Sequence, residues 1–214
     1  MIIKSFEINK IDFKKNNFYL LYGENEGFKN EVVSKNFKEK YLNNTFRYEE
    51  KEILDNTDDF YNSILSKSLF ENERLIIITR VTDKIINVIK EIFEKNIEDI
   101  KFILLAGVLE KKSKLRIFFE KDKNTICIPF YSDTNQTLSA IALNFFRNKK
   151  VPIAQETINL LIERSRGSRQ NLNNELEKVA NYIKSKDKIK NEEILKLTNL
   201  AENYNFSELA DNCL

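Results

Sequence analysis

The chain has 214 residues, of which 42% are hydrophobic and 32% are charged, and its formal net charge is +2. This composition is typical of a globular protein with one large or two small domains, and it excludes a disordered chain. A net charge so close to zero gives, by itself, no reason to expect nucleic-acid binding.

The residue types that are missing exclude several kinds of chemistry. The sequence has no histidine, which removes Ser–His and Cys–His nucleophilic pairs, the usual imidazole base and nearly all zinc sites. Its cysteines, Cys127 and Cys213, favour a reducing cytoplasm, and we interpret Cys127 as a small buried hydrophobic residue. The N-terminal residues lack the apolar segment of a secretion signal, and the longest apolar run, 102–109, is too short for a membrane span. We therefore expect a cytoplasmic protein without a membrane partner.

Strand and helix patterns alternate through the first 134 residues. Runs typical of strands occur at 18–22, 45–48, 75–79, 102–106 and 125–129, and all but the run at 45–48 are mainly apolar. Hydrophobic residues recur at helical spacing at 28–41, 57–65, 85–93 and 113–118. This alternation predicts an α/β domain with a mainly parallel sheet and flanking helices.

From about residue 135 the pattern consists of helices only. Hydrophobic stripes at helical spacing occur at 138–145, 153–162 and 172–183; they predict a small all-helical domain at 135–204. Residues 205–214 begin another helix that stops abruptly, so we expect a part of the structure to be missing downstream.

The loop after the first strand lies where a nucleotide-binding P-loop would be. The working motif, G-x-x-x-x-G-K-[ST], holds phosphate with backbone amides and a lysine, and Mg²⁺ with a hydroxyl. Here Gly23 and Gly27 are one residue closer than the motif requires, and Phe28 follows the second glycine. Lys29 is therefore out of register, and Asn30 supplies no hydroxyl. We interpret the two glycines as a tight turn.

The second element of a nucleotide site is missing too. A carboxylate that binds the metal is expected after a neighbouring strand, but the strand at 75–79 continues into Arg80. We therefore predict no ATP hydrolysis, no catalytic residue, no bound cofactor and no metal.

Leu69 and Phe70 are prominent because no periodic pattern gives them a core face. They follow Ser68 in a turn, and charged or polar residues at 71–74 separate them from the next strand. A large aliphatic residue beside an aromatic one at a solvated corner is typical of an anchor for a partner's pocket. Burying both side chains would contribute about 1.5–3 kcal/mol each. The alternative is that both residues cover the local core beneath the turn.

Several segments, taken together and in order, resemble the delta subunit of bacterial DNA polymerase III, a component of the clamp loader. They are YLLYGENEG (19–27), SLF (68–70), RLIII (74–78), LLAG (104–107), KSKLR (112–116), GSR (167–169), NELEK (174–178) and FSEL (206–209). The resemblance implies an AAA+-like fold. It consists of an α/β domain with a degenerate P-loop at 1–134, a helical lid at 135–204 and, at 205–214, the start of a truncated helical collar.

The same resemblance implies a mechanical function without catalysis. Delta subunits bind the sliding clamp, or beta subunit, and promote its opening for loading onto primed DNA, whereas sister subunits handle ATP. Any polymerase activity belongs to the holoenzyme. Leu69 and Phe70, with Ser68, would form a hydrophobic wedge that enters a pocket on the clamp.

The resemblance also implies further partners, namely the clamp-loader ATPase subunits, the delta-prime subunit and primed DNA. Because the chain ends where the collar begins, we expect clamp binding to survive and assembly with the other loader subunits to be impaired.

Four basic residues are further candidates for contacts with DNA or other subunits. Lys112, Lys114 and Arg116 could face phosphates, but acidic residues flank them, so we favour a solvated start of a helix. Arg169 lies near the position at which the lid of an active ATPase contributes a phosphate sensor. Without a nucleotide, it would contact carboxylates or the DNA backbone.

Two other functions are compatible with the sequence. One is a P-loop ATPase or kinase with an unorthodox loop, whose ATP turnover would depend on Lys29. The other is a catalytically inactive AAA+ scaffold, such as a delta-prime subunit, which would assemble with ATPase partners without binding the clamp. Delta-prime subunits typically carry zinc-binding cysteines, and the sequence has no cysteine cluster.

Overall fold

The computed structural model describes residues 3–13, 15–38, 40–42, 44–65, 73–183, 193 and 196–197. The chain divides into two compact units, Met1–Tyr131 and Ser132–Leu214. The sequence places this division slightly later, after residue 134. The segment interpreted as the start of a collar, 205–214, lies outside the described residues.

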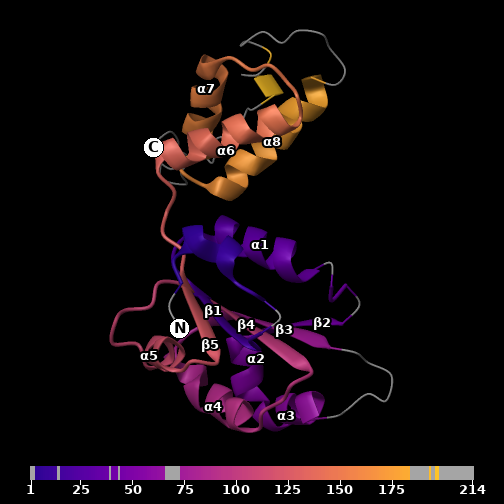
Figure 1. The fold of residues 1–214 in the computed structure, drawn as a ribbon, viewed down its shortest axis with the longest axis vertical. Helices are drawn as coiled ribbons and strands as arrows, with labels where there is room; N and C mark the ends of the chain where they lie inside the picture. The colour runs from indigo at the N-terminus through magenta and orange to yellow at the C-terminus, as the bar shows by residue number, and fades with distance from the viewer. Residues whose placement is uncertain are drawn as a thin grey trace, which may run out of the picture. The chain divides into compact units, whose positions relative to one another are not determined.

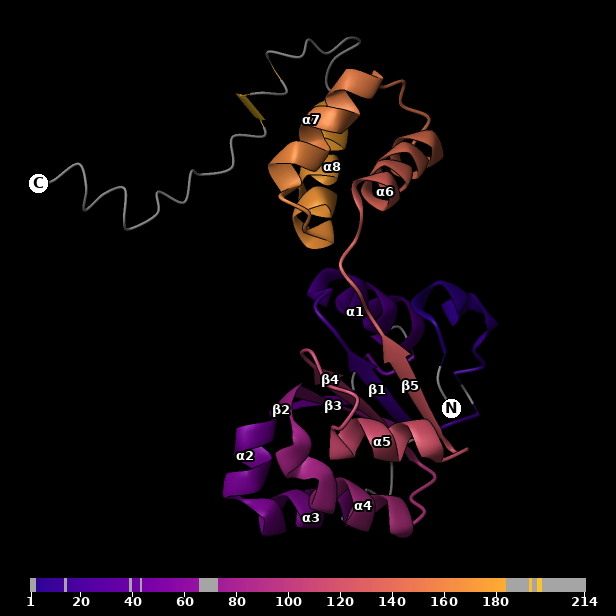
Figure 2. The same ribbon diagram turned by 90° about the vertical axis from the view of Figure 1, so that its left-hand side faces the viewer.

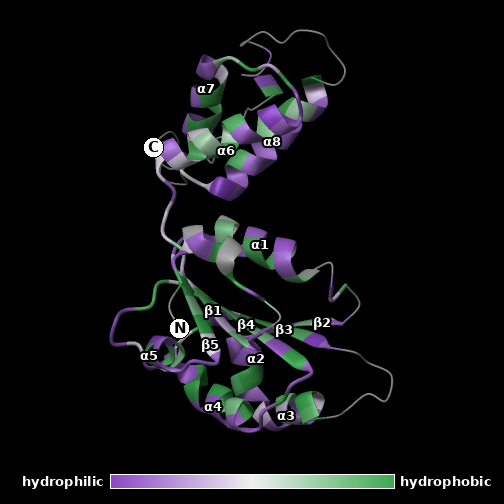
Figure 3. Ribbon diagram, in the orientation of Figure 1, coloured by the Kyte–Doolittle hydropathy of each residue, from purple (hydrophilic) through white to green (hydrophobic). Residues whose placement is uncertain are grey.

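In the described part of the first unit, five strands form one sheet in the order β2-β3-β4-β1-β5. The strands are β1 (Phe18–Tyr22), β2 (Thr45–Glu49), β3 (Arg74–Val81), β4 (Ile100–Ala106) and β5 (Thr125–Pro129). Every pair of neighbouring strands is parallel. The predicted parallel sheet is therefore confirmed, and Figure 3 shows hydrophobic residues along its central strands.

Side chains alternate between the two faces of the sheet, as the period of a strand requires. In β1, Leu20 belongs to the core on one face, whereas Tyr19 and Leu21 belong to the core on the other. The first face is covered by α2 (Glu50–Asp55), α3 (Thr57–Leu65), α4 (Ile86–Glu94) and α5 (Lys114–Lys121). The second face is covered by α1 (Glu26–Val33) and by the short helices Ser5–Lys10 and Ser34–Lys38 (Figures 1 and 2). Burial on both faces explains why β1, β4 and β5, which are buried at every residue, are mainly apolar;.

The start of α1 corrects the sequence analysis. Asn25 caps this helix, because its side chain accepts a hydrogen bond from the Phe28 amide at 3.0 Å. The helix therefore begins at Glu26, and Gly27 lies in its first turn rather than in the preceding loop.

The region between β2 and β3 also differs from the prediction. The sequence pattern gives one helix after β2, whereas the structure has two in the described residues of this region. The additional helix, α2, buries only one hydrophobic residue, Ile53, so it has no apolar stripe. A capping box between Glu49 and Glu52 begins it instead;. In α3, Phe60 and Ile64 are buried as expected, but Leu65 is 49% exposed.

The second unit is all-helical in its described residues. Its helices are α6 (Asn135–Asn148), α7 (Gln155–Ser165) and α8 (Arg169–Ile183). They share a core to which each contributes buried side chains at helical spacing, for example Leu138, Leu161 and Leu176;. No helix in the described ranges of the chain is both long and apolar enough to cross a membrane.

Candidate functional site

The loop after β1 is held tightly against the ends of β4 and β5. The Gly23 amide donates to the Gly107 carbonyl at 2.9 Å, and the Asn25 amide donates to the Phe130 carbonyl at 3.3 Å. Gly23 has a φ of +122°, and a Cβ at this position would lie 2.2 Å from the Phe130 carbonyl oxygen. The Phe28 ring packs edge-on against the Phe130 ring, with centroids 5.1 Å apart. The backbone here thus approaches β5 so closely that only glycine fits at position 23.

Lys29 is fully buried, and its ammonium group is satisfied from within the domain. Its Nζ donates to the Gly23 carbonyl at 2.8 Å and to the Ala106 carbonyl at 2.6 Å, and it pairs with Glu26 at 2.5 Å. These three acceptors match the three protons of an ammonium group. A P-loop lysine directs its charge to phosphate. Here the charge joins the ends of β1 and β4 to the first turn of α1.

We expect Lys29→Met to lower the free energy of unfolding by about 2 kcal/mol, because two carbonyl oxygens lose a charged donor in the core. Denaturant unfolding followed by circular dichroism measures this change. Lys35→Met is the matched control, since Lys35 is exposed and such surface changes stay within about 0.5 kcal/mol. Equal stability of the two variants would contradict the structural role of Lys29.

The end of β3 carries a hydroxyl and a cation where a metal-binding carboxylate would be needed. The Thr79 hydroxyl donates to the Tyr48 carbonyl at 3.2 Å. Arg80, which has a φ of 57°, pairs with Glu49 at 3.0 Å. Within the described ranges, no group of three or more His, Cys, Asp or Glu residues could hold a metal ion. The residues at these strand ends therefore do not fit Mg²⁺ and nucleotide phosphates.

Cys127 is fully buried in β5. Burial raises the pKa of its thiol to about 12, so the thiol stays protonated at neutral pH and is a poor nucleophile. Its packing in the core confirms the interpretation of Cys127 as a small hydrophobic residue.

The predicted wedge, Ser68, Leu69 and Phe70, lies outside the described residues. The chain is described again on either side of it, where α3 ends at Leu65 and β3 begins at Arg74. The structure therefore bears on the wedge hypothesis only through the contacts of these two flanks.

Arg74 joins the two flanks of the wedge segment. Its guanidinium donates to the Ser63 carbonyl at 3.0 Å and to the Ile64 carbonyl at 2.7 Å. These carbonyls lie in the last turn of α3, where an arginine also complements the helix dipole. Next to Arg74, the Glu73 carboxylate accepts a hydrogen bond from the Tyr41 hydroxyl at 2.6 Å. Arg74 thus ties the end of α3 to the start of β3, and Glu73 ties the start of β3 to Tyr41.

The three basic residues near the start of α5 have different environments. Arg116 pairs with Glu120 at 2.7 Å and is largely buried. Lys112 is exposed and pairs with Glu110 at 3.0 Å. Lys114 is exposed and has no ion pair among the described residues. The guanidinium of Arg116 is thus engaged within the domain, while the Lys114 ammonium remains available to a partner.

Arg169 is buried in the second unit, at the start of α8. It forms a bidentate pair with Asp133, with Nε 2.8 Å from one carboxylate oxygen and a terminal nitrogen 2.6 Å from the other. Both side chains are under a tenth exposed. The sequence analysis offered carboxylates or the DNA backbone as its contacts, and the structure shows a carboxylate. The pair ties α8 to the residues that precede α6.

The sequence analysis named Lys29 and Arg74 but did not predict the buried hydrogen bonds that each of them forms. A signal existed for Lys29, which precedes the buried residues Val32 and Val33 by three and four positions and so lies on the same helix face;. No such signal existed for Arg74, because an arginine at the first position of a strand is ordinarily solvated.

The sheet order, the loop after β1 and the helical second unit together define an AAA+-like fold. Among solved structures, the chain is similar to the DNA clamp loader delta protein (YqeN) of Bacillus subtilis, with a TM-score of 0.60, 17% identity, and 90% of this chain and 61% of that chain covered. It is also similar to RuvB, a Holliday junction branch migration motor of Thermotoga maritima, with a TM-score of 0.55, 14% identity, and coverage of 86% and 61%.

At these identities the comparisons show the fold. The chain spans about three fifths of the length of both solved structures. No protein-family model and no curated protein sequence matches it. The fold therefore agrees with the resemblance noted in the sequence, while the function must be inferred from the site.

Proposed function

We propose that the chain is the clamp-binding part of a clamp-loader delta subunit. The fold alone does not select this function, because RuvB, a branch migration motor, is similar as well. The observation that carries the proposal is the loop after β1. The buried Lys29 is committed there to the carbonyls of Gly23 and Ala106, which favours a subunit that does not hydrolyse ATP.

The proposed activity is mechanical. Leu69 and Phe70, with Ser68, enter a hydrophobic pocket on the sliding clamp and favour the opened ring. A ligand shifts such an equilibrium by its difference in affinity for the two states. Arg74 supports this function, since it fixes the last turn of α3 to the start of β3 and so gives the wedge a firm base.

The proposed partners follow from this function. They are the sliding clamp, the ATPase and delta-prime subunits of the loader, and primed DNA within the complex, and the proposed location is the cytoplasm. Lys112 and Lys114 are the exposed candidates for contacts with DNA phosphates;.

Titration of the chain into its own sliding clamp, by calorimetry with and without ATP, tests the proposal. We expect saturable binding that does not depend on ATP, and no release of inorganic phosphate. Phosphate release that disappears in Lys29→Ala would support the P-loop ATPase instead. A folded chain that binds the loader ATPase subunits but not the clamp would support an inactive AAA+ scaffold.

A further inference from the structure

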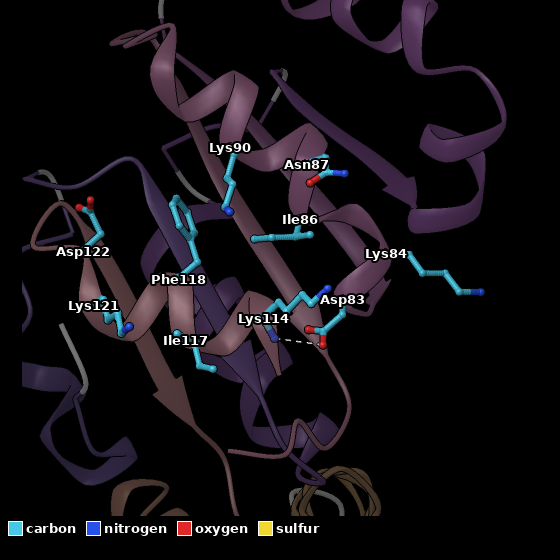
Figure 4. Close-up of a pocket in the computed structure, with 10 residues that line it drawn as sticks. All are labelled: Asp83, Lys84, Ile86, Asn87, Lys90, Lys114, Ile117, Phe118, Lys121 and Asp122. Atoms are coloured by element: carbon cyan, nitrogen blue, oxygen red, sulfur yellow. Dashed lines mark hydrogen bonds between the residues drawn. The ribbon is translucent and has the colours of Figure 1, made fainter. Parts of the chain in front are cut away.

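A cleft of about 920 Å³ lies between α4 and α5 in the first unit, on the face of the sheet opposite α1. Its floor is apolar and is made of Ile86, Ile117 and Phe118 (Figure 4). Ile86 belongs to the core, whereas Ile117 and Phe118 are only partly buried. Hydrophobic surface therefore faces the open side of the cleft.

Lysines surround this floor. Lys90 projects from α4 toward the cleft, and its Nζ lies 6.0 Å from the centroid of the Phe118 ring. Lys114 and Lys121 line the cleft from α5, and Lys84 stands at its end. All four are exposed, and none forms an ion pair in the part of the chain that the structure describes. Their charges are therefore available to a ligand.

The two acidic residues that line the cleft are engaged elsewhere. Asp83 accepts hydrogen bonds from the Ser113 hydroxyl at 2.5 Å and from the amides of Lys114 and Leu115, both at 3.0 Å. Burial alone would raise the pKa of the Asp83 carboxyl, but these hydrogen bonds outweigh it and lower the pKa. Asp122 accepts a hydrogen bond from the Asn124 amide at 2.7 Å. Neither carboxylate forms an ion pair with a lysine of the cleft in the described residues, although the charge of Lys114 helps to lower the pKa of Asp83.

We propose that this cleft binds an acidic peptide segment of a partner protein. The segment's apolar side chains pack against Ile117 and Phe118, and its carboxylates pair with Lys90 and Lys121. A groove between two helices is a common docking place for an extended or helical peptide. Lysines on both sides of the groove provide charge complementarity to carboxylates along the segment.

A peptide fits this surface better than a nucleic acid does. A phosphate backbone would use the lysines and leave the hydrophobic floor without a partner, whereas an acidic segment with apolar residues satisfies both. The cleft shares no residue with the wedge and none with the loop after β1, so the inference does not depend on clamp binding; Lys114 alone is also a candidate for DNA contact in the proposed function.

The test is a selection of random peptides displayed on phage, with the folded full chain as target, followed by fluorescence-polarisation titration of the enriched peptides. We expect the enriched sequences to be acidic and to carry apolar residues. Their affinity for Lys90→Glu/Lys121→Glu should fall at least about tenfold, because attraction becomes repulsion at two contacts. Binding should also weaken as salt rises. Ile117→Ala keeps every charge of the cleft and should also weaken peptide binding, because it removes apolar contact.

Lys35→Glu/Lys51→Glu is the matched control, since it reverses the same number of exposed lysines away from the cleft. This control should keep wild-type affinity. Failure to enrich any acidic peptide, or enriched peptides whose affinity is equal for the cleft variant and the control, would overturn the proposal. Duplex DNA that binds in place of peptides, and is lost in the cleft variant only, would overturn it in favour of a nucleic-acid surface.

Discussion

Gly23→Ala is expected to lower the free energy of unfolding of the first unit by about 3–5 kcal/mol. Two effects add. Gly23 has a φ of +122°, which a residue with a Cβ rarely adopts, and the new Cβ would lie 2.2 Å from the Phe130 carbonyl oxygen. That oxygen belongs to the backbone next to β5, so it cannot move aside as a flexible side chain would.

Gly107→Ala provides the matched control for this change. Gly107 lies in the same region and accepts the hydrogen bond from the Gly23 amide, but a Cβ there meets nothing within 4 Å. The free energy of unfolding of the Gly107→Ala protein should differ from that of the wild type by less than about 1 kcal/mol. Denaturant midpoints of the two variants and the wild type measure the difference. A Gly23→Ala protein as stable as Gly107→Ala would show that the loop after β1 is not held closed.

Leu69→Ala/Phe70→Ala is expected to weaken binding to the sliding clamp at least about a hundredfold. Each side chain contributes about 1.5–3 kcal/mol when fully buried, and each 1.4 kcal/mol corresponds to about tenfold in affinity. Calorimetric titration against the clamp measures the loss. Because no periodic pattern in the sequence gives either residue a core face, we expect the unfolding midpoint to stay close to that of the wild type.

The same residue types elsewhere on the unit provide a control for the wedge. Leu42 is 76% exposed and Phe46 is 41% exposed, so Leu42→Ala/Phe46→Ala removes the same two types of side chain from exposed positions. This variant should bind the clamp as the wild type does. Equal losses for the two double variants would indicate non-specific hydrophobic contact and would count against a wedge.

The fold could be predicted from the sequence because most of its strands are buried on both faces. Strands such as β1 and β4 are continuous apolar runs separated by helical stripes, and this pattern specifies a parallel, helix-covered sheet. The helix α2 could not be predicted in this way. It depends on a capping box between Glu49 and Glu52, a local interaction that leaves no hydrophobic period.

The sequence alone shows that the P-loop is degenerate, but it does not show which groups the displaced lysine contacts instead. Spacing shows that Lys29 is out of register, whereas only the structure shows that its ammonium group bonds to the Ala106 carbonyl, 77 residues away. The pair of Arg169 with Asp133 is similar, since its partners are 36 residues apart. Contacts between distant residues depend on the whole fold and have no local pattern. The wedge, Ser68, Leu69 and Phe70, remains a prediction from sequence.

The most direct test of the proposed function is release of the sliding clamp from closed circular DNA, measured after adding the chain in the absence of any nucleotide. We predict that the wild-type chain accelerates release, because binding alone favours the opened ring. With the Leu69→Ala/Phe70→Ala chain, the clamp should be released at the same rate as without any added chain. A clamp that binds the wild-type chain yet stays on the circle at its unassisted rate would contradict a function in clamp opening.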